Sequence, residues 1–215
     1  MNRLLLRRLA ALLAAGLVVP LALAAGCYVK WGLYDGKFAT ITPGAIYQSA
    51  AYDPAALVAT CAQHGIRTVI DLRDSRDELV SACAAAAAAA GLHHVHLPTR
   101  SHPFRAEADA FLAALRRAER PVLVHCQHGE GRSVMMCAIH RIHNEGWTNE
   151  GAFQGTCRLP DSLQFLTTWL PWLRRFKEHH PKGKFVLDYQ PTTRRPQLNA
   201  SLDRATGRGA GASSR

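Results

Sequence analysis

Cys126 and Arg132 enclose a loop of five residues that contains two glycines. An apolar run at 121–124 leads into the cysteine, and an apolar-periodic segment that starts at Ser133 predicts a helix directly after the loop. Backbone N–H groups at a helix N-terminus are unpaired and favour negative charge, so they form an anion site. The spacing therefore predicts a loop that holds a phosphate group next to an ionised cysteine.

The polar residues of this segment suggest distinct roles. Arg132 carries a planar guanidinium that can bind two phosphate oxygens at once. A free thiol has a pKa of about 8.5, and electropositive helix N-termini lower it, which favours a Cys126 thiolate as the nucleophile. Ser133 can donate a hydrogen bond to the sulfur when it leaves a thiophosphate intermediate. His125 is expected to order the loop through hydrogen bonds rather than to act as a base. The predicted phosphate-binding residues are Gln127, His128, Gly129, Glu130, Gly131 and Arg132.

The His-Cys-x5-Arg-Ser pattern resembles the signature of the cysteine-dependent protein tyrosine and dual-specificity phosphatases. The segments 46–50, 64–73, 97–99 and 142–147 also look like parts of bacterial dual-specificity phosphatases of the cell envelope, so the resemblance covers roughly residues 41–175. It implies a phosphotyrosine-phosphatase-like fold and hydrolysis of a phosphomonoester through a cysteinyl phosphate, with no metal and no cofactor. The alternative is a buried core cysteine in a strand-to-helix turn.

The surrounding elements alternate between strand and helix. Strands are expected at 66–72, 92–97 and 121–125, and helices at 78–90, 106–118, 134–144, 149–157 and 162–179. This order predicts an α/β fold with a mainly parallel central sheet flanked by helices and with the loop at the carboxyl end of a strand. One catalytic domain is expected, at 41–180.

The expected position of the general acid departs from the family pattern. The resemblance implies an aspartate on the loop after the strand that ends in Leu97-Pro98, but residues 98–105 contain no carboxylate. His102 lies nearest the expected place and can donate a proton when it is protonated. Glu107 and Asp109 are second choices. The alternative is that His102 is an ordinary exposed loop residue.

Glu130 bears on the choice of substrate. A carboxylate at the mouth of the pocket disfavours polyanions, which favours a single phosphate on a protein side chain, with phosphotyrosine as the first choice. Two rival functions remain, a lipid or inositol phosphate phosphatase and a phosphate-binding pseudophosphatase. Glu130 also fits a residue that faces outward and touches no substrate.

The N-terminus predicts export. A basic region at 1–8 precedes an uncharged apolar stretch at 9–29, which is long enough to cross a bilayer as a helix. The positive charge before the span predicts an inner-membrane anchor with the catalytic domain in the periplasm. The alternatives are a cleaved signal peptide, with a site near 22–25, that releases the protein into the periplasm, and lipidation at Cys27.

The C-terminal residues 190–215 are basic and poor in apolar side chains, which predicts a disordered tail. The tail contributes much of the formal net charge of +10 and could touch anionic lipids or remain solvated. Nucleic-acid binding is not expected, because the chain shows no recognition motif and its charge is scattered.

The remaining cysteines and histidines predict structural roles. No C-x-x-C motif is present, so free buried cysteines are expected, with one bridge among Cys61, Cys83 and Cys157 or a reversible Cys126–Cys137 pair as alternatives. Alternation on a strand sends His93 to the face opposite His94 and His96, which argues against a metal site there.

Overall fold

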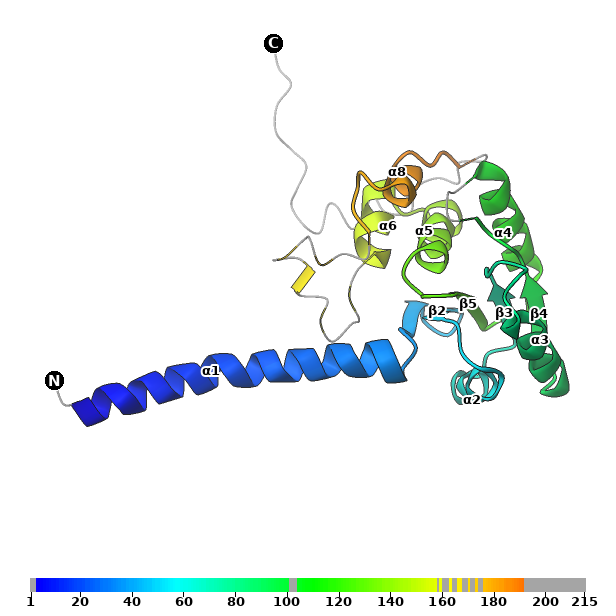
Figure 1. Cartoon of the computed structure of the whole chain (residues 1–215). Coiled ribbons are helices and arrows are strands. Elements are labelled where there is room, and N and C mark those ends of the chain that lie inside the picture. Colours follow the sequence, from blue (N-terminus) through cyan, green and yellow to red (C-terminus); the bar gives the residue numbers. More distant parts are fainter. Residues whose placement is uncertain are drawn as a thin grey trace, which may run out of the picture.

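The structure, a computed structural model, describes residues 3–100, 104–157 and 176–191 and the single positions 159, 163, 166, 167, 170 and 173; for residues 3–15 it describes the backbone alone. Its centre is a five-stranded sheet in the order β1-β2-β5-β3-β4 (Figure 1). The strands are β1 (Ala39–Thr42), β2 (Ile46–Ala50), β3 (Thr68–Asp71), β4 (His93–His96) and β5 (Val122–Cys126). β1 pairs with β2 antiparallel, and the other three pairings are parallel. The predicted mainly parallel sheet is confirmed.

Helices cover both faces of this sheet (Figure 1). They are α2 (Pro54–His64), α3 (Leu79–Ala89), α4 (Arg105–Arg117), α5 (Arg132–Glu145), α6 (Asn149–Thr156) and α8 (Pro181–Leu187). Val69 and Leu123 pack with α2 and α3 in one cluster, whereas Ile70, Val122 and Val124 belong to the larger cluster under α4, α5, α6 and α8. Successive side chains of a strand point to opposite faces, so the buried strands supply both cores.

Most of the predicted elements are confirmed within a few residues, but β1, β2, α2 and α8 were not predicted, and α5 begins earlier than expected. α5 begins at Arg132 and not at 134, because the arginine and Ser133 form its first turn after Gly131. α2 was not predicted, although its start and stop signals are present. The Asp53 carboxylate accepts the Ala56 N–H at 2.9 Å, and Gly65 ends the helix with a φ of 64°.

The packed chain extends beyond the expected range of 41–180 at both ends. Trp31 is buried near the start of the domain, and Val186 and Tyr189 are buried near its end. These apolar side chains belong to short segments that carry no periodic pattern of their own. Half of the predicted helix at 162–179 lies outside the described residues, and its predicted end is wrong, because 176–179 form a bend and turns and not a helix. The predicted tail from residue 192 onward also lies outside the described residues.

The apolar N-terminal stretch forms α1 (Arg3–Val29), which runs into one turn of π-helix, η1 (Lys30–Tyr34), and projects away from the domain (Figure 1). The window Gly16–Tyr34 has a mean hydropathy of 1.5 and is 6% buried, so by length and composition the helix is able to cross a membrane. A signal sequence satisfies the same criteria.

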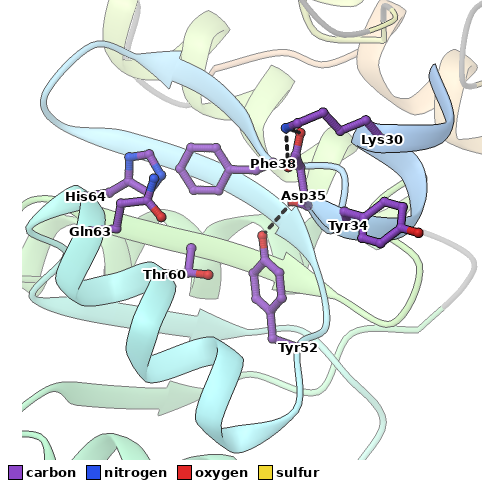
Figure 2. A pocket seen from close by; sticks show the side chains of 8 residues that line it. All are labelled: Lys30, Tyr34, Asp35, Phe38, Tyr52, Thr60, Gln63 and His64. Atoms are coloured by element: carbon purple, nitrogen blue, oxygen red, sulfur yellow. Dashed lines mark hydrogen bonds and ion pairs between the residues drawn. The ribbon is translucent and has the colours of Figure 1, made fainter. Parts of the chain in front are cut away.

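The end of the apolar helix is tied to the domain by polar contacts around a cavity of about 340 Å³. Figure 2 shows Lys30 paired with Asp35, at 2.7 Å, and the Tyr52 hydroxyl donating to the Asp35 carbonyl oxygen at 2.9 Å. Phe38 stacks on His64 of α2 at 4.2 Å between ring centroids. The helix therefore does not end in a free linker.

Candidate active site

The loop between β5 and α5 closes tightly against β2. Gly129 has a φ of 63°, and a Cβ atom there would lie 2.6 Å from the Ala50 backbone nitrogen. Only glycine fits this combination of a left-handed backbone and a close approach. The side-chain amide of Gln48, on β2, donates to the Gly129 carbonyl at 3.0 Å and holds the turn in place. Cys126 ends β5 and Arg132 begins α5, so the loop lies at a helix N-terminus as the sequence predicts.

Cys126 is almost completely buried, at 2% exposure, and its sulfur lies 3.3 Å from the Ser133 hydroxyl oxygen. Burial alone would raise the pKa of this thiol. Hydrogen bonds from the Ser133 hydroxyl and backbone N–H and the charge of Arg132 outweigh burial, and they hold the pKa of Cys126 below its ordinary value. By contrast, burial without such partners raises the pKa of Cys61 to about 11. The loop environment therefore favours a thiolate at Cys126.

Gln48 is a site residue that the sequence analysis missed. Its side-chain amide donates to the Ser133 hydroxyl oxygen at 3.0 Å and to the Ser49 carbonyl at 3.1 Å, and Gln48 is buried. Because the Ser133 oxygen accepts from Gln48, its own proton is available to the Cys126 sulfur at 3.3 Å and to the Ser49 carbonyl oxygen at 3.5 Å. The only signal for Gln48 was its place in the segment 46–50, which resembled a phosphatase segment.

Arg132 links the loop to the ends of two neighbouring strands. One guanidinium nitrogen, Nη1, donates to the Leu72 carbonyl at 2.9 Å and to the Thr99 carbonyl at 3.1 Å. In the part of the chain that the structure describes, Nε and Nη2 of Arg132 have no protein partner. These two nitrogens form the fork that binds two oxygens of a phosphate. Cys126, Arg132 and Ser133 are thus brought together in the predicted arrangement.

The remaining loop residues differ in their surroundings. Gln127, His128 and Glu130 are exposed, and Gly131 is half-buried. Glu130 forms an ion pair with Lys37 at 2.5 Å. The lysine lies just after the apolar helix, at a φ of 55°, and nothing in the sequence pattern linked it to this loop. Because Lys37 compensates its charge, Glu130 repels anions less than its sequence position suggests.

No carboxylate among the described residues offers a clear proton donor. His102 lies outside the described residues. Glu107 accepts the Arg100 N–H at 3.2 Å, and Asp109 pairs with Arg105 at 3.0 Å. Hydrogen bonds from Arg76 lower the pKa of Asp74 to about 2, so Asp74 is ionised at neutral pH.

A buried charged cluster supports the loop from behind. The Arg73 guanidinium binds both oxygens of Asp71, with a shortest distance of 2.7 Å, and both side chains are fully buried. Nε2 of His94 and Nε2 of His125 lie 3.5 and 3.6 Å from the same carboxylate. Burial alone would raise the pKa of Asp71, but the nearby His94 imidazole and the hydrogen bonds from the Arg73 guanidinium hold it well below its usual range.

This cluster corrects the expectation for His125. Neither ring nitrogen has a hydrogen-bond partner among the described residues, so His125 faces Asp71 and does not order the loop through hydrogen bonds. Burial lowers its pKa to about 4 even though the Asp71 charge opposes the shift. Asp71, His94 and His125 offer three ligand atoms within 4.8 Å of one another. However, a metal ion would have to displace Arg73 from the carboxylate, which favours a structural role.

None of the six cysteines forms a disulfide. Cys61 and Cys83 belong to the core on the α2 and α3 face, and Cys157 belongs to the core on the opposite face. The sheet therefore separates Cys157 from the other two. The alternative Cys126–Cys137 pair is also absent, and Cys137 packs in the core on α5.

Comparison with known families decides what this arrangement is. Residues 37–143 match the family described as the phosphatase-like domain of beta-lactamase hydrolase-like proteins. These residues include the whole of the Cys126 to Ser133 loop. The chain contains a cysteine-dependent phosphatase domain.

Individual relatives support the same assignment. The dual specificity protein phosphatase TpbA of Pseudomonas aeruginosa is 40% identical over 63 residues, which is 28% of this chain and 29% of TpbA. The alignment thus spans less than a third of that relative. A crystal structure of TpbA superposes with a TM-score of 0.52 at 23% identity, over 68% of this chain and 81% of TpbA. A crystal structure of TpbA in complex with phosphotyrosine superposes with a TM-score of 0.51 at 22% identity, over 81% of this chain and 93% of TpbA.

The buried His125 predicts a specific loss of stability in acid. Its folded pKa of about 4 lies below the ordinary value of 6.5, so the unfolded chain binds the proton more readily and stability falls as pH drops from 6.5 to 4. We expect His125 to account for roughly 2 kcal/mol of lost unfolding free energy between pH 7 and pH 5. Urea unfolding at the two pH values measures this loss.

The variant His125→Asn should lose that part of the pH dependence. His93→Asn is the matched control, because His93 is exposed beside Glu119 on the neighbouring strand, and it should keep the wild-type dependence. Equal pH dependences for wild type and His125→Asn would contradict the assignment.

Proposed function

We propose that this chain hydrolyses phosphomonoesters through a cysteinyl-phosphate intermediate and that phosphotyrosine in proteins is its preferred substrate. The observation that carries the proposal is the environment of Cys126, a buried thiol whose pKa is held down beside an arginine with two free nitrogens. A buried thiolate is costly to maintain, and it is the species that attacks phosphorus.

The geometry supports a two-step reaction. In the first step the Cys126 sulfur attacks phosphorus, the bond from phosphorus to the ester oxygen breaks, and the alcohol leaves with a proton. The loop amides and Nε and Nη2 of Arg132 hold the equatorial oxygens, where negative charge develops. In the second step a water molecule attacks the phosphocysteine, inorganic phosphate leaves, and the hydrogen bond from Ser133 stabilises the sulfur anion that is released.

The choice of phosphotyrosine rests on the relatives and on chemistry. TpbA is a dual specificity protein phosphatase and binds phosphotyrosine in a crystal structure of the same fold. A phenolate is a far better leaving group than an alkoxide, which suits a site without a clear acid. The Lys37–Glu130 pair keeps an inositol or lipid phosphate as the second candidate, because it lowers the repulsion that Glu130 would exert on polyanions. A substrate panel of phosphotyrosine peptides, inositol phosphates and phospholipids separates these candidates.

The nucleophile assignment predicts the behaviour of Cys126→Ser. The variant should lose turnover by at least about a thousandfold, because a serine hydroxyl stays protonated at neutral pH, and yet it should still bind oxyanions through the backbone amides and Arg132. Steady-state hydrolysis of an aryl phosphate and calorimetric titration with tungstate measure the two properties.

Cys137→Ala is the control, because this buried thiol lies on the same helix but outside the loop, and it should remain active. Trapping of a covalent phosphocysteine in the wild type distinguishes an enzyme from a pseudophosphatase. Undiminished hydrolysis by Cys126→Ser would overturn the mechanism.

The missing acidic donor makes a second kinetic prediction. We propose that His102 donates the proton, so hydrolysis should slow as pH rises through a histidine pKa of about 6.5. Aryl phosphates should be much better substrates than alkyl phosphates. His102→Ala should lose the dependence on that pKa and should slow most on poor leaving groups.

His93→Ala serves as the matched histidine control in this experiment and should behave like wild type. The measurement is the slope of log kcat/KM against leaving-group pKa. Identical slopes for wild type and His102→Ala would remove the histidine from the mechanism, and the proton would then have to come from another group.

For the location, we propose an inner-membrane anchor with the catalytic domain in the periplasm, supported by the basic residues in the first turns of α1, by the apolar stretch that follows them and by the exposure of the described part of that helix. A reporter that is active only outside the cytoplasm should be active when it is fused after Arg215. The same reporter fused to residues 30–215 should be inactive, because that chain lacks the helix. A fusion of the full chain that is active only in the cytoplasm would refute this topology.

A further inference from the structure

Among the residues that the structure describes, three cations lie around the phosphate loop, and two of them already have protein partners. Lys37 is paired with Glu130, and Nη1 of Arg132 donates to two backbone carbonyls. The third is Lys182, on the first turn of α8. A Cβ atom added to Gly131 of the loop would lie 3.1 Å from Cε of Lys182 and 3.7 Å from its Nζ. The lysine side chain therefore lies directly against the loop that precedes Arg132.

The ammonium of Lys182 has no protein partner in the part of the chain that the structure describes. Its backbone N–H donates to His180, but no carboxylate pairs with its side chain. The residue is only half exposed. Burial lowers the pKa of Lys182, the charge of Arg132 lowers it further, and the charge of Cys126 raises it. An unpaired, half-buried cation beside a second cation is unfavourable until an anion binds between them.

The position of Lys182 is fixed by the docking of α8 on α6. The Asn149 side-chain amide donates to the carbonyls of Val186, Leu187 and Tyr189 at 3.1, 2.8 and 2.8 Å. Gly183 is buried so closely that a Cβ atom would lie 2.2 Å from the Lys177 carbonyl oxygen. These contacts hold the lysine at the loop before any ligand arrives, so binding costs little further ordering.

We propose that Lys182 binds the phosphate group of the substrate together with Arg132, and is thus a substrate-binding residue supplied by α8. For the identity of the substrate this rests on the proposed function, whereas for the anion it rests on the loop alone. Arg132 grips two oxygens as a planar fork, and the lysine supplies a point charge that can reach a third oxygen. The site then carries two positive charges toward a dianionic phosphate.

The test separates binding from turnover by using the full chain in detergent with Cys126→Ser as the parent protein. Calorimetric titration with tungstate, a tetrahedral oxyanion that is not hydrolysed, gives the dissociation constant. Adding Lys182→Met should raise this constant about tenfold, as expected for one lost charge-assisted hydrogen bond. Adding Lys182→Arg should restore affinity to within about twofold, because a merely structural role would not be rescued by charge.

Lys184→Met is the matched control, since it removes the same charge from an exposed position on the same helix and should leave binding unchanged. Lys182→Gln serves as a second variant if Lys182→Met does not fold. Tungstate binding by either folded variant that equals the parent's would overturn the proposal, and so would a parent that does not bind tungstate. If the parent binds tungstate but the chain with Cys126 shows no turnover, the proposed function fails while the role of Lys182 is still decided by the dissociation constants.

Discussion

The stabilisation of negative charge on the buried Cys126 sulfur, whose pKa is lowered, is the constraint on which the other features of the site depend. A charge removed from water costs several kcal/mol unless fixed dipoles and opposite charges replace the solvent. Here the replacement comes from the N-terminus of α5, the Ser133 hydroxyl and Arg132. Each of these requires a further support. Gln48 orients the hydroxyl, Gly129 lets the loop close on the backbone of β2, and the carbonyls of Leu72 and Thr99 hold the guanidinium. The thiolate thus explains why residues from four separate segments converge.

Most charged side chains around the site are paired with an opposite charge, both behind the loop and at its rim. Below the loop the Asp71 carboxylate is matched by Arg73, and His125 stays neutral because burial lowers its pKa. At the rim Lys37 matches Glu130. Two nitrogens of Arg132 and the ammonium of Lys182 have no carboxylate partner among the described residues. The phosphate dianion that we propose as ligand would supply negative oxygens to these groups.

The sequence predicted the parts of the site that are local in the chain. A strand, a five-residue loop and a helix follow one another in 121–144, and their spacing alone places Cys126, Arg132 and Ser133 together. Gln48, Lys37 and Lys182 could not be predicted as site residues, because they reach the loop through strand pairing and helix docking across about 50 to 90 positions of chain. Similarly, α2 was missed although it has a capping aspartate and a C-terminal glycine, since its alanine-rich sequence shows little periodicity. Local signals identified the chemistry, and tertiary contacts supplied its electrostatic setting.

The segment that follows the apolar helix, around Gly36 and Lys37, packs against β2 and the loop between β5 and α5. The Gly36 carbonyl accepts the Ala50 N–H at 2.7 Å, Ala50 is the residue against which Gly129 packs, and Lys37 pairs with Glu130. Trp31, six positions earlier, donates its indole N–H to the Phe38 carbonyl at 3.0 Å. Every one of these contacts lies after residue 25. Cleavage of the helix near 22–25 would therefore remove the proposed membrane anchor and leave all of these contacts intact. Whether the helix is kept or removed thus decides where the phosphatase domain works, while the chemistry of its loop is the same in both cases.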